Sequence, residues 1–317
     1  MRPCKYSMKL FEKTKNKLAR NFFIDFSDDY RDSILLVGSG RSGTTWVSDI
    51  INYDNEYRYI FEPFHPRRVD FCKELGHRKY IHPDKKDTKL REKFKYVLNG
   101  GLRSPWSDYY NKKLLANKRL IKEIRINLCL KWIKNNFHKI PVVLLIRNPF
   151  PTSISKDKFN LHTDLNDYLL QEDLMSDYLK DFKHDIIKAK EASEFERNMF
   201  IWCIENYIPL KQLKKDDVLI TCYETFCKSP EVEIKRTFNF IGKDFNESVL
   251  KTLNKPSAVS KNWSAINTGE DLINSWKKKI TEDQIKRGKE ILALFGMDNF
   301  YNDDSTPNIE SIERFMG

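Results

Sequence analysis

The sequence lacks long hydrophobic runs and paired cysteines, and it holds only 11 glycines among 317 residues. Its longest apolar stretch, residues 142–146, has the length of a strand, whereas a membrane-spanning helix needs about 20 apolar residues, so we expect no transmembrane protein. The six cysteines occur at irregular spacings without a C-x-x-C pair, which excludes a disulfide framework and a structural zinc site. Because the first residues are charged and lack the apolar core of a secretory signal, the sequence predicts a cytoplasmic protein with reduced thiols.

Positive charge is concentrated in two segments. Of the formal net charge of +11, residues 1–20 contribute +6, with seven Lys or Arg against one Glu, and residues 65–95 contribute +6, with eleven against five acids. The rest of the chain is therefore close to neutral. A protein that binds single-stranded nucleic acid places aromatic side chains between its cations, but Phe94 is the only aromatic residue in 85–95. We therefore expect no nucleic-acid partner.

No internal repeat or linker rich in Pro, Gly and Ser divides the chain, which favours a single domain over residues 24–300. Residues 1–23 predict a basic amphipathic helix with Leu10, Phe11 and Leu18 on one side. Two interpretations of this helix are open: a solvated surface helix, or peripheral attachment to an anionic membrane. Residues 301–317 are expected to form a C-terminal tail.

Strand and helix patterns alternate between the two ends. The strand candidates lack strict polar alternation, as expected of strands covered on both faces, and lie at 33–37, 57–61, 141–147 and 218–223. Apolar residues at helical spacing occur at 44–51, 128–137, 195–210 and 231–241. Thr281 to Gln284 forms a capping box for a further helix that Gly296 closes. The sequence therefore predicts an α/β fold with a central, mostly parallel sheet flanked by helices.

The loop after the first strand candidate concentrates glycine, at positions 38, 40 and 43. Such a loop points backbone N–H groups and a helix N-terminus at an anion. The spacing of its glycines matches the nucleotide-binding P-loop, but Thr44 stands where that loop has the lysine that reaches the β- and γ-phosphates. The cation here is Arg41, two residues before the last glycine. We therefore expect a nucleotide with a single 5′-phosphate rather than ATP.

Arg41-Ser-Gly-Thr-Thr-Trp46 resembles the 5′-phosphosulfate-binding loop of the sulfotransferases that use 3′-phosphoadenylyl sulfate (PAPS). A second mark of this family is an arginine at a strand end, followed by Asn-Pro and by a serine eight residues after the arginine. Arg147 and Ser155 match it. The resemblance implies a P-loop-like sulfotransferase fold, PAPS as the sulfuryl donor and no metal. It also implies that Arg147 and Ser155 hold the 3′-phosphate.

The resemblance assigns further donor contacts. It places the 5′-phosphosulfate on the loop residues, and these are Arg41, Ser42, Gly43, Thr44 and Thr45. It places the adenine near Trp46 and Tyr223. Trp276-Lys277 is similar to a late Trp-Lys stretch of the family, and Lys261 lies where cytosolic members add contacts to the 3′-phosphate. An arginine at position 41, as in carbohydrate sulfotransferases, implies electrostatic stabilisation of the leaving phosphate rather than acid catalysis.

The same comparison predicts Glu62 as the catalytic base. The histidine of the cytosolic members is absent, because Arg125 stands at its position, 22 residues before Arg147. Phe61-Glu62-Pro63 instead resembles the Tyr-Glu-Pro segment of sugar 6-O-sulfotransferases, and partial desolvation of Glu62 would raise its pKa toward the working pH. The alternative is a structural carboxylate that pairs with Arg125 or Arg67. His65 and Glu123 are the other candidates for the base.

We interpret the chain as an enzyme that transfers the sulfuryl group of PAPS to a hydroxyl of a carbohydrate, either a polysaccharide or a glycolipid. The charge at 65–95 begins three residues after Glu62, so we expect it to border the acceptor cleft and to favour an anionic acceptor. Two alternatives are open. A P-loop kinase for a small metabolite would need the missing lysine and an acidic Mg²⁺ ligand, and a non-catalytic nucleotide- or nucleic-acid-binding protein would rest on the charge alone.

Overall fold

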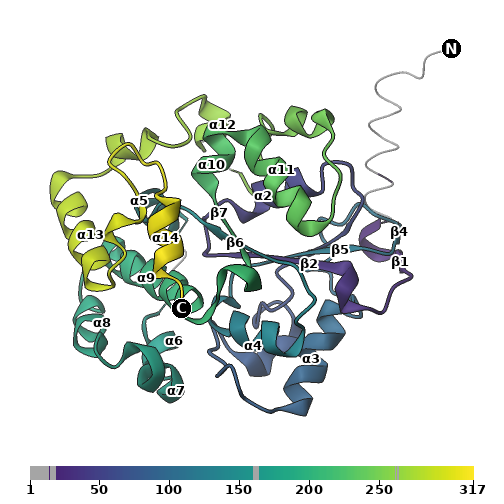
Figure 1. Cartoon of the computed structure of the whole chain (residues 1–317), viewed down its shortest axis with the longest axis horizontal. Helices are drawn as coiled ribbons and strands as arrows, with labels where there is room; N and C mark the ends of the chain where they lie inside the picture. Colours follow the sequence, from purple (N-terminus) through teal and green to yellow (C-terminus); the bar gives the residue numbers. More distant parts are fainter. Residues whose placement is uncertain (1–13, 15–18, 160–163, 261, 263) are drawn as a thin grey trace.

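A computed structural model describes residues 14, 19–159, 164–260, 262 and 264–317 (Figure 1). The strands are β1 (Ile24–Asp25), β2 (Ser33–Gly38), β3 (Arg58–Phe61), β4 (Leu115–Ala116), β5 (Arg119–Glu123), β6 (Val142–Ile146) and β7 (Leu219–Cys222). The helices are α2 (Thr44–Ile51), α3 (Thr88–Leu98), α4 (Leu130–Asn136), α5 (Pro149–Lys158), α6 (Asn166–Leu169), α7 (Glu172–Leu174), α8 (Lys183–Ala189), α9 (Glu194–Gln212), α10 (Tyr223–Lys228), α11 (Pro230–Ile241), α12 (Ala265–Thr268), α13 (Glu282–Leu294) and α14 (Ile309–Phe315).

Five strands form one parallel sheet in the order β3-β5-β2-β6-β7, and β1 pairs with β4 in a separate two-stranded sheet. The four predicted strands of the large sheet are confirmed, but β5 was not foreseen. β5 is the direct neighbour of β2, where Val37 lies opposite Glu123. Because the chain builds outward from β2 in both directions, the loops that follow β2, β3, β5 and β6 meet at one edge of the sheet.

Helices cover both faces of the sheet (Figure 1). One face carries α2, α10 and α11, whose buried residues pack with the side chains of Ile34 and Leu36. The other carries α3, α4 and the central helix α9, which pack with Leu35 and Val37. Successive residues of β2 are thus buried on opposite faces, which explains why the strand shows no polar alternation. The predicted α/β fold is confirmed.

The expectations for the two ends of the chain have different outcomes. The expected helix at 1–23 lies mostly outside the described residues. Residues 301–317, expected as a tail, include α14, and Gly317 N–H donates to the carbonyl of Leu210 in α9. The predicted capping box of Thr281 and Gln284 is present at the start of α13. Among the described helices, none is long and apolar enough to cross a membrane.

Candidate active site

The glycine loop leads from β2 into the first turn of α2. Gly43 is the N-cap of α2 with φ of +91°, and Arg41 has φ of +73°. A Cβ on Gly43 would lie 2.5 Å from Cδ2 of Tyr223. Glycine is therefore required twice, by the left-handed backbone and by the close approach of the aromatic ring. The loop brings the unpaired N–H groups of the first turn of α2 to the carboxyl edge of the sheet.

Gly43→Ala tests this close approach. We expect the variant to bind adenosine 3′,5′-bisphosphate at least about tenfold more weakly in calorimetry, because either the loop or Tyr223 must shift. Gly242→Ala is the matched control: it imposes a similar backbone strain, with φ of +67°, but its Cβ would meet nothing within 4 Å. An equal loss of affinity in both variants would contradict the assignment of the loop to the nucleotide.

Two arginines form the positive end of the site. Arg41 Nε donates to Oγ of Ser155 over 3.0 Å, and Arg147 Nη1 donates to the carbonyl of Arg41 over 3.2 Å. Burial and the charge of Arg147 lower the pKa of Arg41 to about 10. In the described part of the chain, neither guanidinium pairs with a carboxylate, and Arg147 Nε and Ser42 Oγ are buried without a hydrogen-bond partner. Two adjacent cations and orphaned donors are the features of an anion-binding site.

An aromatic wall stands beside the arginines. The rings of Trp46 and Tyr223 lie 5.3 Å apart, and both residues are less than one-tenth exposed. The guanidinium of Arg147 lies over the Tyr223 ring at 4.0 Å, which fixes the ring and the cation against each other. Trp46 Nε1 donates to the carbonyl of Leu253. The wall is rigid and lines the same cleft as the arginines.

Glu62 lines the same cleft and lies immediately after β3. Its carboxylate accepts hydrogen bonds from Lys122 Nζ at 2.5 Å and from Arg125 Nη1 at 2.6 Å. Burial alone would raise the pKa of Glu62, but the two cations dominate and lower it to about 2. The expected raised pKa is therefore wrong, because desolvation is outweighed by two direct ion pairs. The alternative pairing with Arg125 is present, whereas no ion pair joins Glu62 to Arg67 among the described residues.

The two other candidate bases lie close to Glu62 in different environments. His65 lines the cleft and is half-buried, and burial together with the charge of Arg125 lowers its pKa to about 4. Glu123 is fully buried and accepts backbone N–H groups of Phe64, Ile124 and Arg125. It does not line the cleft. The prediction of Glu123 as a base is therefore wrong: its carboxylate holds together the turns that follow β3 and β5.

The cleft has a volume of about 420 Å³ and joins the two ends. Its lining includes Gly43, Thr44, Thr45, Trp46, Tyr223, Ser155, Glu62 and His65. Ser42, also a residue of the loop, is fully buried and is not among the residues that line the cleft. Among the described residues, seven cations line the cleft against a single carboxylate, that of Glu62, and the cations are Arg41, Arg68, Lys122, Arg125, Arg147, Lys158 and Lys279. Trp276 lines it as well, whereas Lys261 is outside the described residues.

The basic segment 65–95 contributes little to this lining. Of its cations, only Arg68 reaches the cleft. Others pair elsewhere: Arg78 is buried against Glu205, and Lys93 pairs on the surface with Glu74. The expectation that this segment borders the acceptor cleft is therefore wrong in the main. The other cations that line the cleft among the described residues lie outside this segment, and they are Arg41, Lys122, Arg125, Arg147, Lys158 and Lys279.

Sequence reasoning assigned no role to two residues that line the cleft with Glu62, and these are Trp106 and Lys122. Lys122 and Arg125 were visible as a basic pair, but their importance depends on β5 lying next to β3. Trp106 packs on Phe61 at 5.4 Å and on His65 at 5.3 Å, so it forms the apolar wall beside the base candidates. No cluster of His, Cys, Asp and Glu that could hold a metal ion occurs among the described residues.

Comparison with known proteins identifies the family. The family model described as "Sulfotransferase domain" matches residues 31–294. The chain therefore belongs to the sulfotransferase family, the PAPS-dependent enzymes that its loop motif resembles. No curated protein matches the sequence.

Solved structures are similar to this chain at low sequence identity. Mouse sulfotransferase SULT7A1, complexed with PAP, is 14% identical over 89% of this chain and 88% of its own, with a TM-score of 0.42. Retinol dehydratase in complex with androsterone and PAP is 16% identical over 90% and 84%, with a TM-score of 0.41. A sulfotransferase from Alicyclobacillus acidocaldarius is 12% identical over 83% and 94%, with a TM-score of 0.40.

Proposed function

We propose that the protein transfers the sulfuryl group of PAPS to a hydroxyl of an anionic carbohydrate. One observation carries the proposal: a single cleft joins an arginine pair, which has no carboxylate partner among the described residues, to a carboxylate held between two cations. The first arrangement suits the phosphates of a donor, and the second suits the hydroxyl of an acceptor.

The residues at the arginine end fit the donor. Arg41, Gly43, Thr44 and Thr45 would surround the 5′-phosphosulfate at the start of α2. Arg147 lines the cleft and would reach the 3′-phosphate with its guanidinium, and Ser155 keeps its hydroxyl proton for donation because its oxygen accepts from Arg41. When bound, the donor supplies an activated sulfuryl group and a phosphate leaving group.

The residues around the transferred group act through charge and position. The sulfur–oxygen bond to the phosphate breaks as a new bond to the acceptor oxygen forms, and Arg41 would stabilise the charge that grows on the phosphate. Glu62 would accept the proton of the acceptor hydroxyl. A carboxylate with a pKa of about 2 is a weak base. In a loose transition state, however, the acceptor hydroxyl loses its proton late, when its bond to sulfur has already made it strongly acidic, so a weak base is sufficient. The placement of Glu62 then matters more than its basicity.

The acceptor end supports a polar, negatively charged substrate. Arg68, Lys122 and Arg125 lie with Glu62 on this side, so the local charge is positive. Trp106, which is partly exposed and packs on the buried Phe61, offers an aromatic surface on which the apolar face of a sugar ring would stack. These features favour a carbohydrate that carries carboxylate or sulfate groups over an apolar alcohol.

Transfer from labelled PAPS to a panel of acceptors tests the proposal. We expect an anionic glycan to be sulfated at least about tenfold more efficiently, in kcat/KM, than its uncharged counterpart, and an apolar alcohol such as retinol to be a poor acceptor. The preference should weaken as salt rises. Equal turnover of all three acceptors, or a preference for the alcohol, would contradict the carbohydrate assignment.

Thermal shift separates the sulfotransferase from the kinase alternative. Adenosine 3′,5′-bisphosphate should raise the melting temperature, whereas ATP with Mg²⁺ should not, because Thr44 replaces the P-loop lysine and no acidic metal cluster occurs among the described residues. Stabilisation by ATP alone would contradict the assignment of the donor.

A further inference from the structure

Exposure is inverted along residues 22–26, the segment that contains β1. Phe22, Ile24 and Phe26 are 71%, 54% and 68% exposed, whereas Phe23 and the side chain of Asp25 are buried. A surface strand ordinarily turns its apolar side chains inward and its charged ones to water. Here the segment presents its apolar side chains to solvent and its carboxylate to the protein.

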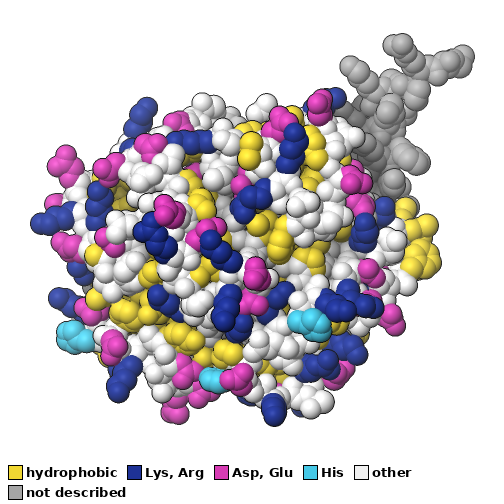
Figure 2. All heavy atoms as spheres, viewed as in Figure 1, with side chains coloured by type: hydrophobic (Ala, Val, Ile, Leu, Met, Phe, Trp, Pro, Cys, Tyr) yellow, Lys and Arg dark blue, Asp and Glu magenta, His cyan; other side chains and the backbone are white. Residues whose placement is uncertain are grey.

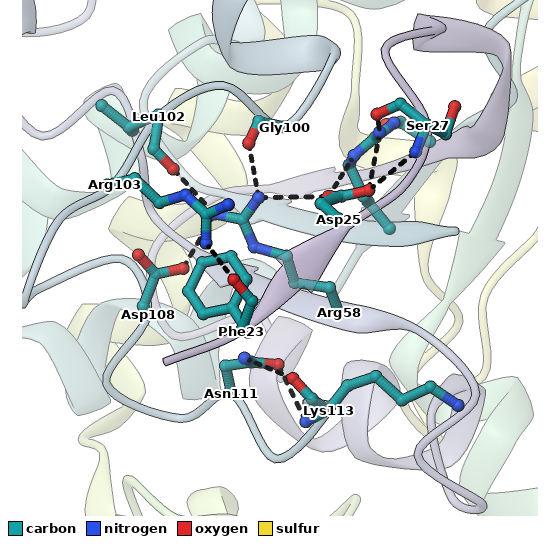
Figure 3. A network of polar contacts seen from close by, with 12 residues as sticks. Phe23, Asp25, Ser27, Arg58, Gly100, Leu102, Arg103, Asp108, Asn111 and Lys113 are labelled. Atoms are coloured by element: carbon teal, nitrogen blue, oxygen red, sulfur yellow. Dashed lines mark hydrogen bonds and ion pairs between the residues drawn. The ribbon is translucent and has the colours of Figure 1, made fainter. Parts of the chain in front are cut away.

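The inward side of this segment is tightly bound (Figure 3). The Asp25 carboxylate accepts from Arg119 Nε and Nη2 at 2.7 and 2.9 Å and from Arg58 Nη1 at 3.2 Å. Phe23 lies under the guanidinium groups of Arg58 and Arg103, at 4.0 and 3.6 Å. Because buried ion pairs fix the inward side, the outward direction of Phe22, Ile24 and Phe26 is a fixed property of the fold.

The apolar surface extends onto the neighbouring strand. Ile24 lies opposite Leu115 of β4, which is 56% exposed. Figure 2 shows hydrophobic side chains gathered at the edge of the molecule where Figure 1 places β1 and β4. We call Phe22, Ile24, Phe26 and Leu115 the β1 face. A group of large apolar side chains held outward in this way marks an interaction surface.

Cations lie beside one part of the β1 face. Arg20 and Arg103 line the hollow of about 760 Å³ between β1 and residues 103–115, whose one lining carboxylate among the described residues, Asp108, is paired with Arg58. The chain that leads into Phe22 carries seven Lys or Arg against one Glu over residues 1–20. Exposed aromatic and aliphatic side chains next to cations suit the boundary of an anionic bilayer, where the apolar groups enter the acyl region and the cations meet the headgroups.

We propose that the β1 face docks on an anionic lipid surface. The position of the face is compatible with catalysis, because Asp25 is bound to the first residues of β3 and β5, Arg58 and Arg119. The cleft lies at the opposite, carboxyl edge of the same sheet. A protein docked through the β1 face therefore keeps its cleft open to acceptors in solution or on a neighbouring surface.

Vesicle co-sedimentation of the full chain tests the proposal. Vesicles of phosphatidylcholine with 30% phosphatidylserine, about the anionic content of a charged leaflet, should retain the protein, and pure phosphatidylcholine should not. The double variant Phe22→Ser/Phe26→Ser should bind at least about tenfold more weakly, because two aromatic side chains no longer enter the bilayer. Leu170→Ser is the matched control: Leu170 is 80% exposed, lies outside the β1 face and should bind as wild type.

Each result supports or overturns the proposal that the β1 face docks on an anionic lipid surface. Wild-type binding by the double variant would overturn it and assign attachment to residues 1–20 alone. Failure of the wild-type protein to bind either kind of vesicle would also overturn it. If the wild-type protein then elutes as a dimer that the double variant dissociates, the face pairs two copies of the chain. Unchanged bisphosphate-induced thermal shifts in both variants establish that they are folded.

Discussion

Replacing Arg147 by alanine should weaken the binding of adenosine 3′,5′-bisphosphate about 100-fold while leaving the fold intact. The guanidinium occupies a half-buried position, keeps an unpartnered Nε and lies near the charge of Arg41 without a carboxylate partner in the described chain. A phosphate would be its first full counter-ion, and a charge-assisted hydrogen bond in such a site is worth up to about 3 kcal/mol. Isothermal titration with the bisphosphate measures the loss directly.

Two further variants sharpen this prediction. Arg147→Lys keeps the charge but loses the planar fork, and we expect it to recover only part of the affinity. Arg287→Ala removes a cation from the surface of α13, where it pairs with Glu196, and should bind as wild type. If Arg147→Ala bound the bisphosphate normally, the 3′-phosphate would lie elsewhere.

Glu62→Gln should lower turnover about 10²- to 10⁴-fold, the usual range for loss of a general base, and leave bisphosphate affinity nearly unchanged. The glutamine oxygen still accepts one hydrogen bond from Lys122 or Arg125, but it cannot take the acceptor proton. Steady-state kinetics combined with titration of the bisphosphate separates the two effects.

Glu56 provides the matched control for this variant. It is also a carboxylate between two cations, with Lys118 and Lys243 each at 2.7 Å, but it lies outside the cleft. Glu56→Gln should therefore retain turnover. This result would show that the loss of an ion-paired carboxylate does not by itself lower turnover. Near-normal turnover by Glu62→Gln, together with a large loss in His65→Gln, would transfer the role of base to His65.

The pH dependence gives an independent readout. The lowered pKa of Glu62, about 2, keeps the carboxylate ionised as pH falls, so the base form is lost only in strong acid. We expect kcat/KM to stay flat from about pH 7 to about pH 5. A decline centred above about pH 6 would contradict both Glu62 and His65, whose pKa values are lowered in the free enzyme.

The donor end of the site could be predicted from the sequence because its residues are adjacent along the chain. Gly43, Thr44 and Trp46 belong to one strand-loop-helix unit, and Arg147 ends a strand that is apolar throughout. Their geometry follows from local rules, namely a glycine with positive φ and a helix N-terminus. The structure brings them together in one cleft.

The acceptor end could not be predicted in the same way. The sequence of β5, Arg-Leu-Ile-Lys-Glu, has three charged residues in five, so its periodicity does not indicate a buried strand. It is buried because Arg119 pairs with Asp25, Lys122 pairs with Glu62 and Glu123 binds backbone N–H groups. Asp25, Glu62 and Phe64 lie far from β5 in the sequence, so these contacts cannot be read from its pattern. The lowered pKa of Glu62 depends on its contacts with Lys122 and Arg125 and could therefore not be predicted either.

The order of strands has a consequence for changing the enzyme. The segments that follow β2, β6 and β7 supply the arginine pair and the aromatic wall, whereas the turn after β3 supplies Glu62, and β5 with the turn after it supplies Lys122 and Arg125. The first group comes from β2 and the strands on one side of it, and the second comes from the strands on its other side. We therefore expect that changes in the two segments around Glu62 and Lys122 can alter the proposed acceptor preference without replacing a residue assigned to the donor.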